Sequence, residues 1–596
     1  MTGHFVDVFL PGPWWNPLTY LSPRNVQEGV RVVVPMGRGK RVGFARTSVN
    51  PPCGVDLRSL ERIVDDVPPL GEELWQLALW LCGRSLCGLG ATLALLSPAP
   101  LLRGEPCACP SLPERRPRAF SERLLFDVDE GRRWSSYRDE ITAHAGEGLV
   151  LFPEQLSARR FWETLPESLR PEVLLWSHQA GNRRWEDWQR LRRGEVRIVV
   201  GSPSALFAPL QDLSLVIVEE EGHSSYQSLG TPFFNARSVA ARRAQLAEAR
   251  LVLGGSLPSA RLYRSRKPPS PRPSKGKIRF VDVKNAPGAV LPGLRDPLKL
   301  SEVLIEETLA VVNAGKKALW ILDRKGYAAE VACEECGSAL LCRRCGTPCR
   351  LCGGLLQCPT CRERQPLPDR CPRCGGGLLQ GNRPGLEALA SLATAVTGEA
   401  FPVRLWHADL GQTKKRRSDL KRDLVRGGVV VGSRGALSLC DEGGVALVGW
   451  IDVDGEARRP FFDARHHAFR MIWESCWRGP DGLSRRVVLQ SRCPGVGWQQ
   501  GLRGGWGLFW AGELEERRSL ELPPFAVLVE IDGGGQREAL LAALRAGGLD
   551  PLEGDSPQAP LWLSCQRLAL CREAVEPFFD IGRSRRGFPK IRVWTD

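Results

Sequence analysis

The chain has 596 residues, and its 43% hydrophobic content is enough to form several globular domains. Its 82 Lys and Arg residues outnumber 67 acidic residues, and the resulting net charge of +15 favours partners with phosphate backbones. The start of the chain lacks a basic segment followed by an apolar one, and no apolar run is long enough for a membrane-spanning helix. These features argue against export and membrane insertion. We therefore expect a cytoplasmic protein whose cysteines stay reduced.

Parallel α/β layers are predicted by short apolar runs that end in Gly and Ser and alternate with helical stretches. The first set includes "EVRIVVGSPSALF" (residues 195–207) and "LSLVIVEEEGHSSY" (residues 213–226). The second set follows the apolar segment "ALWIL" (residues 318–322) and continues in residues 427–455. A Pro-rich basic segment, residues 265–277, lies between the two sets and is typical of a linker.

Ten of the twenty cysteines fall between residues 333 and 374, as five Cys-x-x-Cys pairs. Such a pair forms a tight turn that points two thiolates at one ion, and two pairs complete a tetrahedral zinc site. In a reducing compartment this spacing predicts structural zinc sites. A redox role for one pair is the alternative, but redox motifs seldom occur in series.

Eight cysteines suffice for two zinc ions, which leaves one pair over. Only three residues separate Cys345 from Cys349, too few for the chain to turn back and close a site, whereas twelve separate Cys345 from Cys358. We therefore predict an inner site nested within an outer one. The predicted ligands are Cys342, Cys345, Cys358 and Cys361 in the inner site and Cys333, Cys336, Cys371 and Cys374 in the outer site. The leftover pair, Cys349 and Cys352, could replace either pair of the inner site.

Several segments around the cysteines resemble, in the expected order, those of the primosomal protein N′ (PriA) family of replication-restart helicases. The segments are "GVRVVVPMGRGKRVGFA", "GSPSALFAPL", "EEEGHSSY", "LDRKGYA", "IDVDG" and "LELPPFAVLVEID". The resemblance covers almost the whole chain. It implies a superfamily-2 helicase core of two RecA-like lobes, a double zinc-binding insertion in the second lobe, and an N-terminal domain that binds DNA 3′ ends.

The resemblance implies a multidomain α/β fold with a β-rich N-terminal domain and a small C-terminal α/β domain. We predict an N-terminal DNA-binding domain (1–104), a linker (105–122), a first lobe (123–264), a Pro-rich linker and lobe junction (265–300), a second lobe (301–332 and 375–515), the zinc insertion (333–374) and the C-terminal domain (516–596). The linker 105–122 is too short for a domain core, so we expect the family's winged-helix domain to be missing.

The phosphate-binding loop departs from the family pattern. The family frame, leucine-leucine-x-Gly-x-Thr-Gly-Ser-Gly-Lys-Thr, falls on residues 124–134. Its glycines, lysine and threonine supply backbone amides, a cation and a magnesium ligand to the nucleotide. Here three glycines are replaced by Asp127, Glu130 and Arg132, the lysine by Arg133 and the threonine by Trp134. We expect the carboxylates to repel phosphate and the side chains of Arg132 and Trp134 to fill the space that phosphates need.

Three further motifs also depart from the family. The family's Asp-Glu-Glu-His becomes Glu219-Glu220-Glu221-Gly222, so the His is lost while Glu219 could still contact a metal ion. The coupling motif Gly-Ser-Ala-Thr becomes residues 254–257, Gly-Gly-Ser-Leu. The two arginines that would stabilise the transferring phosphoryl group fall on Pro480 and Leu483. Four altered motifs predict that nucleotide turnover, and ATP as a cofactor, have been lost.

We therefore expect a degenerate member of the family, with two zinc ions and no catalytic residues. By resemblance, it would bind fork, branched or single-stranded DNA and recruit primosome or other replication and repair proteins at the nucleoid. Two alternatives remain: an active ATP-dependent 3′–5′ helicase with a divergent nucleotide site, and a zinc-containing interaction protein that no longer binds DNA.

Overall fold

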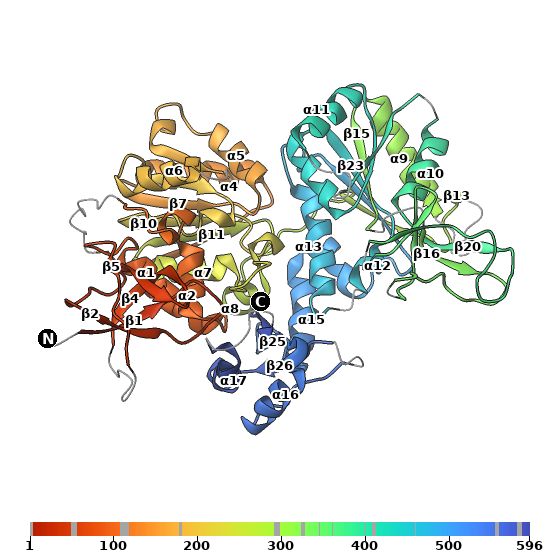
Figure 1. Cartoon of the computed structure of the whole chain (residues 1–596). Helices are drawn as coiled ribbons and strands as arrows, with labels where there is room; N and C mark the ends of the chain where they lie inside the picture. Colours follow the sequence, from red (N-terminus) through yellow and green to blue (C-terminus); the bar gives the residue numbers. More distant parts are fainter. Residues whose placement is uncertain are drawn as a thin grey trace. The chain divides into compact units, whose positions relative to one another are not determined.

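The computed structural model describes most of the chain, in two compact units that are treated separately below (Figure 1). The described residues are 4–48, 56–107, 118–177, 182–290, 299–323, 328–344, 346–359, 362–398, 400–407, 413–458, 461–554, 559–580 and 587–596. The first unit comprises residues 1–127, 132–268 and 514–596, and the second comprises residues 128–131 and 269–513.

The first unit begins with an antiparallel sheet whose strands lie in the order β2-β1-β4-β3-β5. The strands are β1 (His4–Phe9), β2 (Leu18–Ser22), β3 (Arg31–Met36), β4 (Gly39–Thr47) and β5 (Arg62–Ile63). The hairpin between β3 and β4 turns at Gly37, whose φ of +60° favours glycine. The helices α1 (Glu72–Arg84), α2 (Leu89–Leu96) and α3 (Ala99–Leu102) follow. Their leucines share a core with Phe9 and Phe44 of the sheet.

A six-stranded parallel sheet forms the next layer of this unit, in the order β6-β11-β10-β7-β9-β8. Its strands are β6 (Ser121–Phe126), β7 (Glu147–Leu151), β8 (Val173–Trp176), β9 (Ile198–Gly201), β10 (Leu213–Val218) and β11 (Arg250–Gly255). Its helices are α4 (Glu130–Ala143), α5 (Gln155–Glu163), α6 (Asn182–Arg192), α7 (Ala236–Leu246) and α8 (Ala260–Arg266). Alternate residues of β10 enter two different cores, Leu215 and Ile217 in one and Val216 and Val218 in the other. The sheet is therefore buried on both faces, as parallel sheets require.

The first unit ends in a small antiparallel sheet of order β26-β25-β27. Its elements are β25 (Val527–Asp532), α16 (Arg537–Ala546), β26 (Leu561–Cys565), α17 (Leu568–Val575) and β27 (Lys590–Trp594). Phe579 of this domain stacks on Trp15 of the N-terminal domain, with ring centroids 4.5 Å apart. Because Trp14, Trp15 and Tyr20 are all buried, these aromatic residues serve the core.

The second unit is built on another six-stranded parallel sheet, of order β12-β24-β23-β15-β22-β21. Its strands are β12 (Ile278–Asp282), β15 (Lys317–Ile321), β21 (Val403–Trp406), β22 (Gly428–Gly432), β23 (Val445–Trp450) and β24 (Arg486–Ser491), and β13 (Gly288–Val290) and β14 (Lys299–Ser301) form a separate ladder. Its helices are α9 (Glu302–Asn313), α10 (Leu386–Thr397), α11 (Lys414–Asp423), α12 (Val453–Ala457), α13 (Ala464–Trp477) and α14 (Gln500–Gly504), and α15 (Trp506–Ser519) crosses the boundary between the units.

The cysteine-rich insertion leaves this sheet after β15 and forms an antiparallel sheet of order β19-β18-β17-β16-β20. Its strands are β16 (Ala328–Cys333), β17 (Arg350–Cys352), β18 (Leu355–Gln357), β19 (Arg364–Pro366) and β20 (Leu379–Pro384). The outgoing strand β16 pairs with the returning strand β20, and Cys333 lies opposite Leu379. Residues 324–327, which belong to the family-like segment "LDRKGYA", lie outside the described residues.

The predicted multidomain α/β fold is confirmed. Within residues 265–300, predicted as a Pro-rich linker and lobe junction, strand β12 pairs with β24 as an edge strand of the second parallel sheet. Because only Val281 of β12 is fully buried, its hydrophobic pattern is too weak to indicate a strand from the sequence. Most of linker 105–122 lies outside the described residues. In the described parts of the chain, no helix is both long and apolar enough to cross a membrane.

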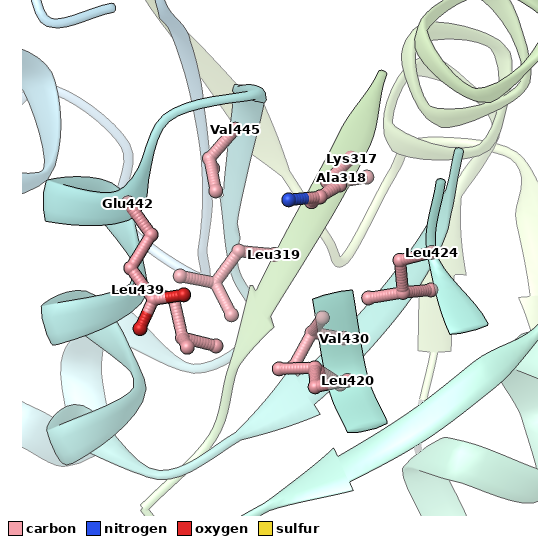
Figure 2. A pocket seen from close by; sticks show the side chains of 9 residues that line it. All are labelled: Lys317, Ala318, Leu319, Leu420, Leu424, Val430, Leu439, Glu442 and Val445. Carbon is pink, nitrogen blue, oxygen red and sulfur yellow. The ribbon is translucent and has the colours of Figure 1, made fainter. Parts of the chain in front are cut away.

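A small cavity lies beside β15 and β22 of the second sheet (Figure 2). Its wall consists mainly of aliphatic side chains, including Leu319, Leu420 and Val430, with Lys317 and Glu442 at its border. Its volume of about 10 Å³ is no larger than one water molecule needs. This cavity is therefore a packing defect and not a ligand site.

Candidate functional site

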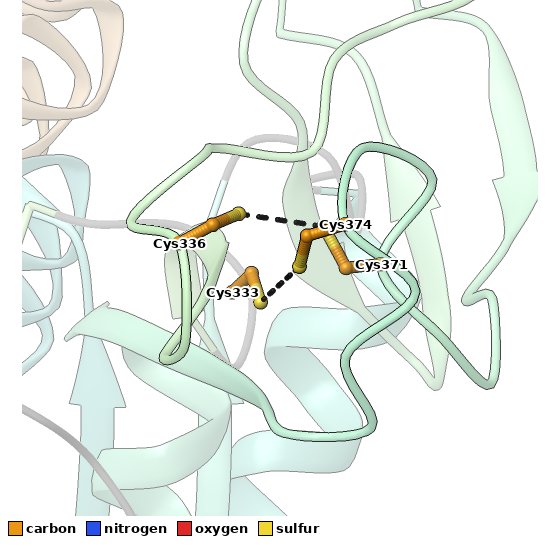
Figure 3. Close-up of side chains that lie close together, drawn as sticks. All are labelled: Cys333, Cys336, Cys371 and Cys374. Carbon is orange, nitrogen blue, oxygen red and sulfur yellow. Dashed lines mark hydrogen bonds between the residues drawn. The ribbon is translucent and has the colours of Figure 1, made fainter.

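The cysteines predicted for the outer metal site lie together in the structure (Figure 3). The sulfur atoms of Cys333, Cys336, Cys371 and Cys374 all lie within 4.8 Å of one another. The Cys333 and Cys374 sulfurs are 3.6 Å apart, and those of Cys336 and Cys371 are 3.7 Å apart. A tetrahedral zinc ion with bonds of about 2.3 Å requires sulfur separations of about 3.8 Å. The four thiols can therefore hold a metal ion of this size.

Each outer pair forms the same tight turn. The amide of the first cysteine donates to the carbonyl five residues later, and its own carbonyl accepts from the amide four residues later, at 2.8 to 2.9 Å. A glycine with positive φ, Gly337 or Gly375, follows the second cysteine. A hydrogen bond with Ser338 lowers the pKa of Cys336 to about 6, whereas for Cys374 the hydrogen bond from the Gly376 amide is outweighed by the neighbouring Cys336 thiol and by burial, which raise its pKa to about 12.

Two further pairs share this turn. The amide of Gly346 donates to the Cys342 carbonyl at 2.9 Å, and the amide of Arg362 donates to the Cys358 carbonyl at 3.2 Å. Gly346 and Arg362 both have positive φ, at +72° and +63°. Cys342 and Cys358 are buried in one small core. Their predicted partners, Cys345 and Cys361, lie outside the described residues.

The leftover pair has a different backbone. Residues 350–352 form strand β17, which turns through Gly353 and Gly354 into β18. The amide of Gly353 donates to Glu387 and not to the Cys349 carbonyl. Cys352 ends this strand and Cys349 precedes it, so this pair lacks the tight turn that the other pairs form. The assignment of Cys342, Cys345, Cys358 and Cys361 to an inner site stays a prediction.

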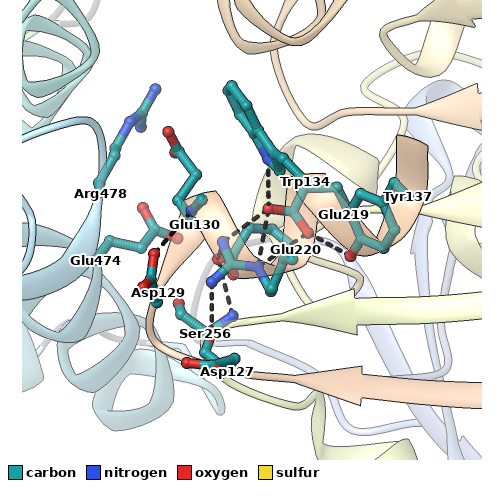
Figure 4. Close-up of polar contacts among 12 residues, drawn as sticks. Asp127, Asp129, Glu130, Trp134, Tyr137, Glu219, Glu220, Ser256, Glu474 and Arg478 are labelled. Carbon is teal, nitrogen blue, oxygen red and sulfur yellow. Dashed lines mark hydrogen bonds and ion pairs between the residues drawn. The ribbon is translucent and has the colours of Figure 1, made fainter. Parts of the chain in front are cut away.

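The altered phosphate-binding loop connects β6 to α4 in the first parallel sheet (Figure 4). Arg133, in the first turn of α4, is only 3% exposed, and its guanidinium lies against Glu219 and Glu220 after β10. Its Nη2 atom is 2.7 Å from Glu219 Oε1 and 3.1 Å from Glu220 Oε1. Its Nε atom donates to both Glu219 oxygens, at 3.1 and 3.2 Å. The positions that hold a lysine and an acid in the family thus form an internal ion pair.

Two neighbours on α4 complete the hydrogen bonding of Glu219. Trp134 Nε1 donates to Oε1 at 3.2 Å, and the Tyr137 hydroxyl donates to Oε2 at 2.7 Å. Burial alone would lower the pKa of Arg133, but the charges of Glu219 and Glu220 raise it above its usual value. Burial and the charge of Glu219 raise the pKa of Tyr137 well above its usual value. Both side chains therefore keep their donor protons at neutral pH.

The other residues of the loop differ in part from expectation. Arg132 is 76% exposed and lies 3.8 Å from Asp127, so it does not fill the phosphate space as we predicted. Trp134 points into the core, edge-on to Phe152 and Phe161, because the helix places it on the apolar face of the sheet. Asp129 accepts a hydrogen bond from Gly131, and Glu130 begins α4. These carboxylates leave the loop acidic, as predicted.

Glu221 has its own buried arginine. Its Oε2 atom is 3.2 Å from Arg237 Nε, and its Oε1 atom accepts from the amide of Ser259 at 2.6 Å. Arg237 also pairs with Asp596. Gly222 follows in a turn. Sequence reasoning did not predict that Arg133 and Arg237 are buried in ion pairs with these acids. An arginine in place of the lysine, opposite acidic residues across a nucleotide site, is a signal that the charges could pair.

Comparison with known proteins gives consistent results. Residues 7–98 match the family model of the PriA 3′ DNA-binding domain (3′BD). The replication restart protein PriA of Bacillus subtilis is 25% identical over 65% of this chain and 50% of its own length. The Treponema pallidum PriA is 26% identical over 84% of this chain and 81% of its own length, and the Rickettsia felis PriA is 24% identical over 89% and 87%.

Among solved structures, RecG bound to a three-way DNA junction matches 67% of this chain and 43% of its own, at 13% identity and a TM-score of 0.34. This similarity is too low to support an argument about function. The domain match and the relatives that align over most of the chain agree with the order of motifs along it. The domain match and these relatives support membership of the PriA family of replication restart proteins.

Proposed function

We propose that the chain acts in replication restart without helicase activity. It binds fork, branched or single-stranded DNA and recruits primosome or other replication and repair proteins in the cytoplasm, at the nucleoid. The match of residues 7–98 to a 3′ DNA-binding domain supports the DNA-binding part. The net charge of +15 provides the electrostatic attraction that any phosphate backbone requires.

The buried pair between Arg133 and Glu219 carries the proposal that nucleotide turnover is lost. In P-loop enzymes the corresponding cation binds nucleotide phosphates and the corresponding acid helps to hold magnesium. Here each group satisfies the other, so a nucleotide would have to break a buried ion pair before it could bind. Asp127, Asp129 and Glu130 add repulsion toward phosphate. The two parallel sheets then serve as a scaffold.

We also propose two structural zinc ions in the insertion. The outer ion is held by Cys333, Cys336, Cys371 and Cys374, whose sulfurs are suitably spaced. The inner ion is held by the two pairs at residues 342/345 and 358/361, because Cys342 and Cys358 begin the same type of turn. When bound, the ions replace disulfides as crosslinks of a module with a very small core.

The central experiment measures DNA-stimulated ATP hydrolysis beside binding to fork, duplex and single-stranded oligonucleotides. The proposal expects binding with a preference for branched DNA and phosphate release at background. Turnover that Arg133→Ala abolishes would favour an active helicase with a divergent site. Normal folding and zinc content without salt-sensitive DNA binding would favour an interaction protein that no longer binds DNA.

A further inference from the structure

Two cysteines outside the zinc insertion face each other at the end of α1. Cys82 lies in the last turn of this helix, and Cys87 lies in the turn before α2. The Cys82 sulfur is 3.1 Å from the Cys87 carbonyl oxygen, and the Cys87 sulfur is 3.9 Å from the Cys82 carbonyl oxygen. The Cys87 amide also donates to the Cys82 carbonyl at 3.3 Å. This reciprocal arrangement places each sulfur beside the backbone carbonyl of the other cysteine.

A cation from the C-terminal domain, within the same unit, contacts this dithiol. Arg572 of α17 donates to the carbonyls of Cys82 and Cys87, both at 3.3 Å, and its Nη2 atom is 3.7 Å from the Cys82 sulfur. The same guanidinium lies over the ring of Trp15, 4.5 Å from its centroid. Positive charge beside a thiol stabilises the thiolate, which is the reactive form.

Cys87, but not Cys82, borders a cavity with room for a small molecule. A cavity of about 540 Å³ is lined by Cys87, by aromatic side chains that include Trp15 and Phe588, and by Lys590. Lys590 is exposed and supplies a positive charge suited to an anionic thiol compound. Cys82 is the more exposed of the two cysteines, at 8% against 2% for Cys87.

We propose that Cys82 and Cys87 form a redox-active dithiol that a low-molecular-weight disulfide converts into an intramolecular disulfide. The Cys82 thiolate attacks one sulfur of the external disulfide and releases one external thiolate. The Cys87 thiolate then attacks the Cys82 sulfur and releases the second. Two protein thiols are oxidised, the external disulfide is reduced to two thiols, and the two protein protons pass to the leaving thiolates.

Oxidation removes the charge that Arg572 contacts, so it loosens the contact between α17 and the N-terminal domain. A hydrogen bond with Cys87 and the charge of Arg572 together outweigh burial and lower the pKa of Cys82 to about 7, whereas the hydrogen bond with Cys82 and burial raise the pKa of Cys87 well above its usual value. A substantial fraction of Cys82 is thus thiolate at neutral pH. The inference is independent of the proposed DNA and zinc functions.

The test uses the zinc-loaded full chain in buffers of reduced and oxidised glutathione, followed by acid quenching, alkylation and trypsin. Arg84 separates the two cysteines, so they fall in the tryptic peptides 63–84 and 85–103. The expected product is these two peptides joined, two hydrogens lighter than their sum, while the buried thiols Cys440 and Cys571 stay reduced. Hydrogen exchange in α17 should rise on oxidation in the parent but not in Cys87→Ser.

Three outcomes would overturn the proposal. First, the joined peptides could be absent at every glutathione ratio. Second, the cysteines of the zinc insertion could be oxidised before Cys82. Third, hydrogen exchange in α17 could be the same before and after the joined peptides form. Cys82→Ser should fold and bind zinc as the parent does, which separates a redox role from a purely structural one.

Discussion

Arg133 Nη2 lies 2.7 Å from Glu219 Oε1, and both side chains are only 3% exposed. The two residues are 86 positions apart in the sequence, and they meet because β6 and β10 both end at the same edge of one parallel sheet. In the family frame they stand where a phosphate-binding lysine and a magnesium-binding acid would be. In this chain the two side chains form an ion pair with each other.

We expect Arg133→Met to destabilise the first parallel sheet by about 3–5 kcal/mol, because it leaves Glu219 buried without a countercharge. Hydrogen exchange in α4 and β10 under increasing urea measures the effect. The neighbour Arg132 is 76% exposed, so Arg132→Met is a matched control that should stay within about 0.5 kcal/mol of the parent. Adding Glu219→Gln to Arg133→Met should restore part of the loss. Equal effects at positions 132 and 133 would contradict the buried pair.

Nucleotide should neither turn over nor stabilise the chain. ATP with magnesium would have to displace Arg133 from two carboxylates and approach the acidic residues 127–130. We expect no shift in melting temperature with ATP or ADP, and phosphate release at the buffer level with or without DNA. Phosphate release by the parent that is lost in Arg133→Ala and kept in Arg132→Ala would refute this prediction.

The sequence was sufficient for features that depend on short-range patterns. The buried runs of β10 and β15 and the turns at Cys333 and Cys371 follow from residues within a few positions of one another. The role of Arg133 could not be read in this way, because its partner comes from a distant strand. Trp134 was misplaced for a related reason: its position in the loop frame did not reveal which face of α4 it occupies.

The predicted zinc ligands show the same limit of sequence reasoning within one module. Spacing alone left Cys349 and Cys352 as possible replacements for either pair of the inner site. The backbone distinguishes them, because residues 350–352 are extended whereas Cys342 and Cys358 begin tight turns. A strand of three residues next to two glycines gives too weak a pattern for this distinction to be made from the sequence.

The metal content of cysteine variants should follow this backbone pattern. We expect about two zinc ions per chain in the parent and in Cys349→Ser, and one in Cys342→Ser. Cys333→Ser should also lose one ion and raise hydrogen exchange throughout the insertion, because the outer site closes the segment that contains the inner one. Native mass spectrometry counts the ions directly. Loss of an ion from Cys349→Ser, with retention of both in Cys342→Ser, would reverse our assignment of the inner site.

DNA affinity should fall steeply as salt rises, because basic side chains displace counterions from the phosphates. Lys415 on α11 and Arg426 just after it are both exposed. Replacing both by Ala should weaken binding several-fold at low salt and reduce the slope of log affinity against log salt by about 2. Fluorescence anisotropy with a forked oligonucleotide measures both quantities. An unchanged slope would show that this surface does not contact phosphate, and a flat salt response of the parent would contradict electrostatic binding altogether.

The reactivity of Cys82 should titrate near neutral pH. A hydrogen bond with Cys87 and the charge of Arg572 lower its pKa to about 7, so the thiol is protonated below this pH and becomes a thiolate above it. The rate of modification by iodoacetamide, followed on peptide 63–84, should therefore rise through about pH 7, whereas an ordinary cysteine rises near pH 8.5. Arg572→Gln removes the favourable charge and should move the midpoint upward, while Arg545→Gln, an exposed position on α16, should not. A midpoint near 8.5 in the parent, or one that Arg572→Gln leaves unchanged, would show that the guanidinium does not activate this thiol.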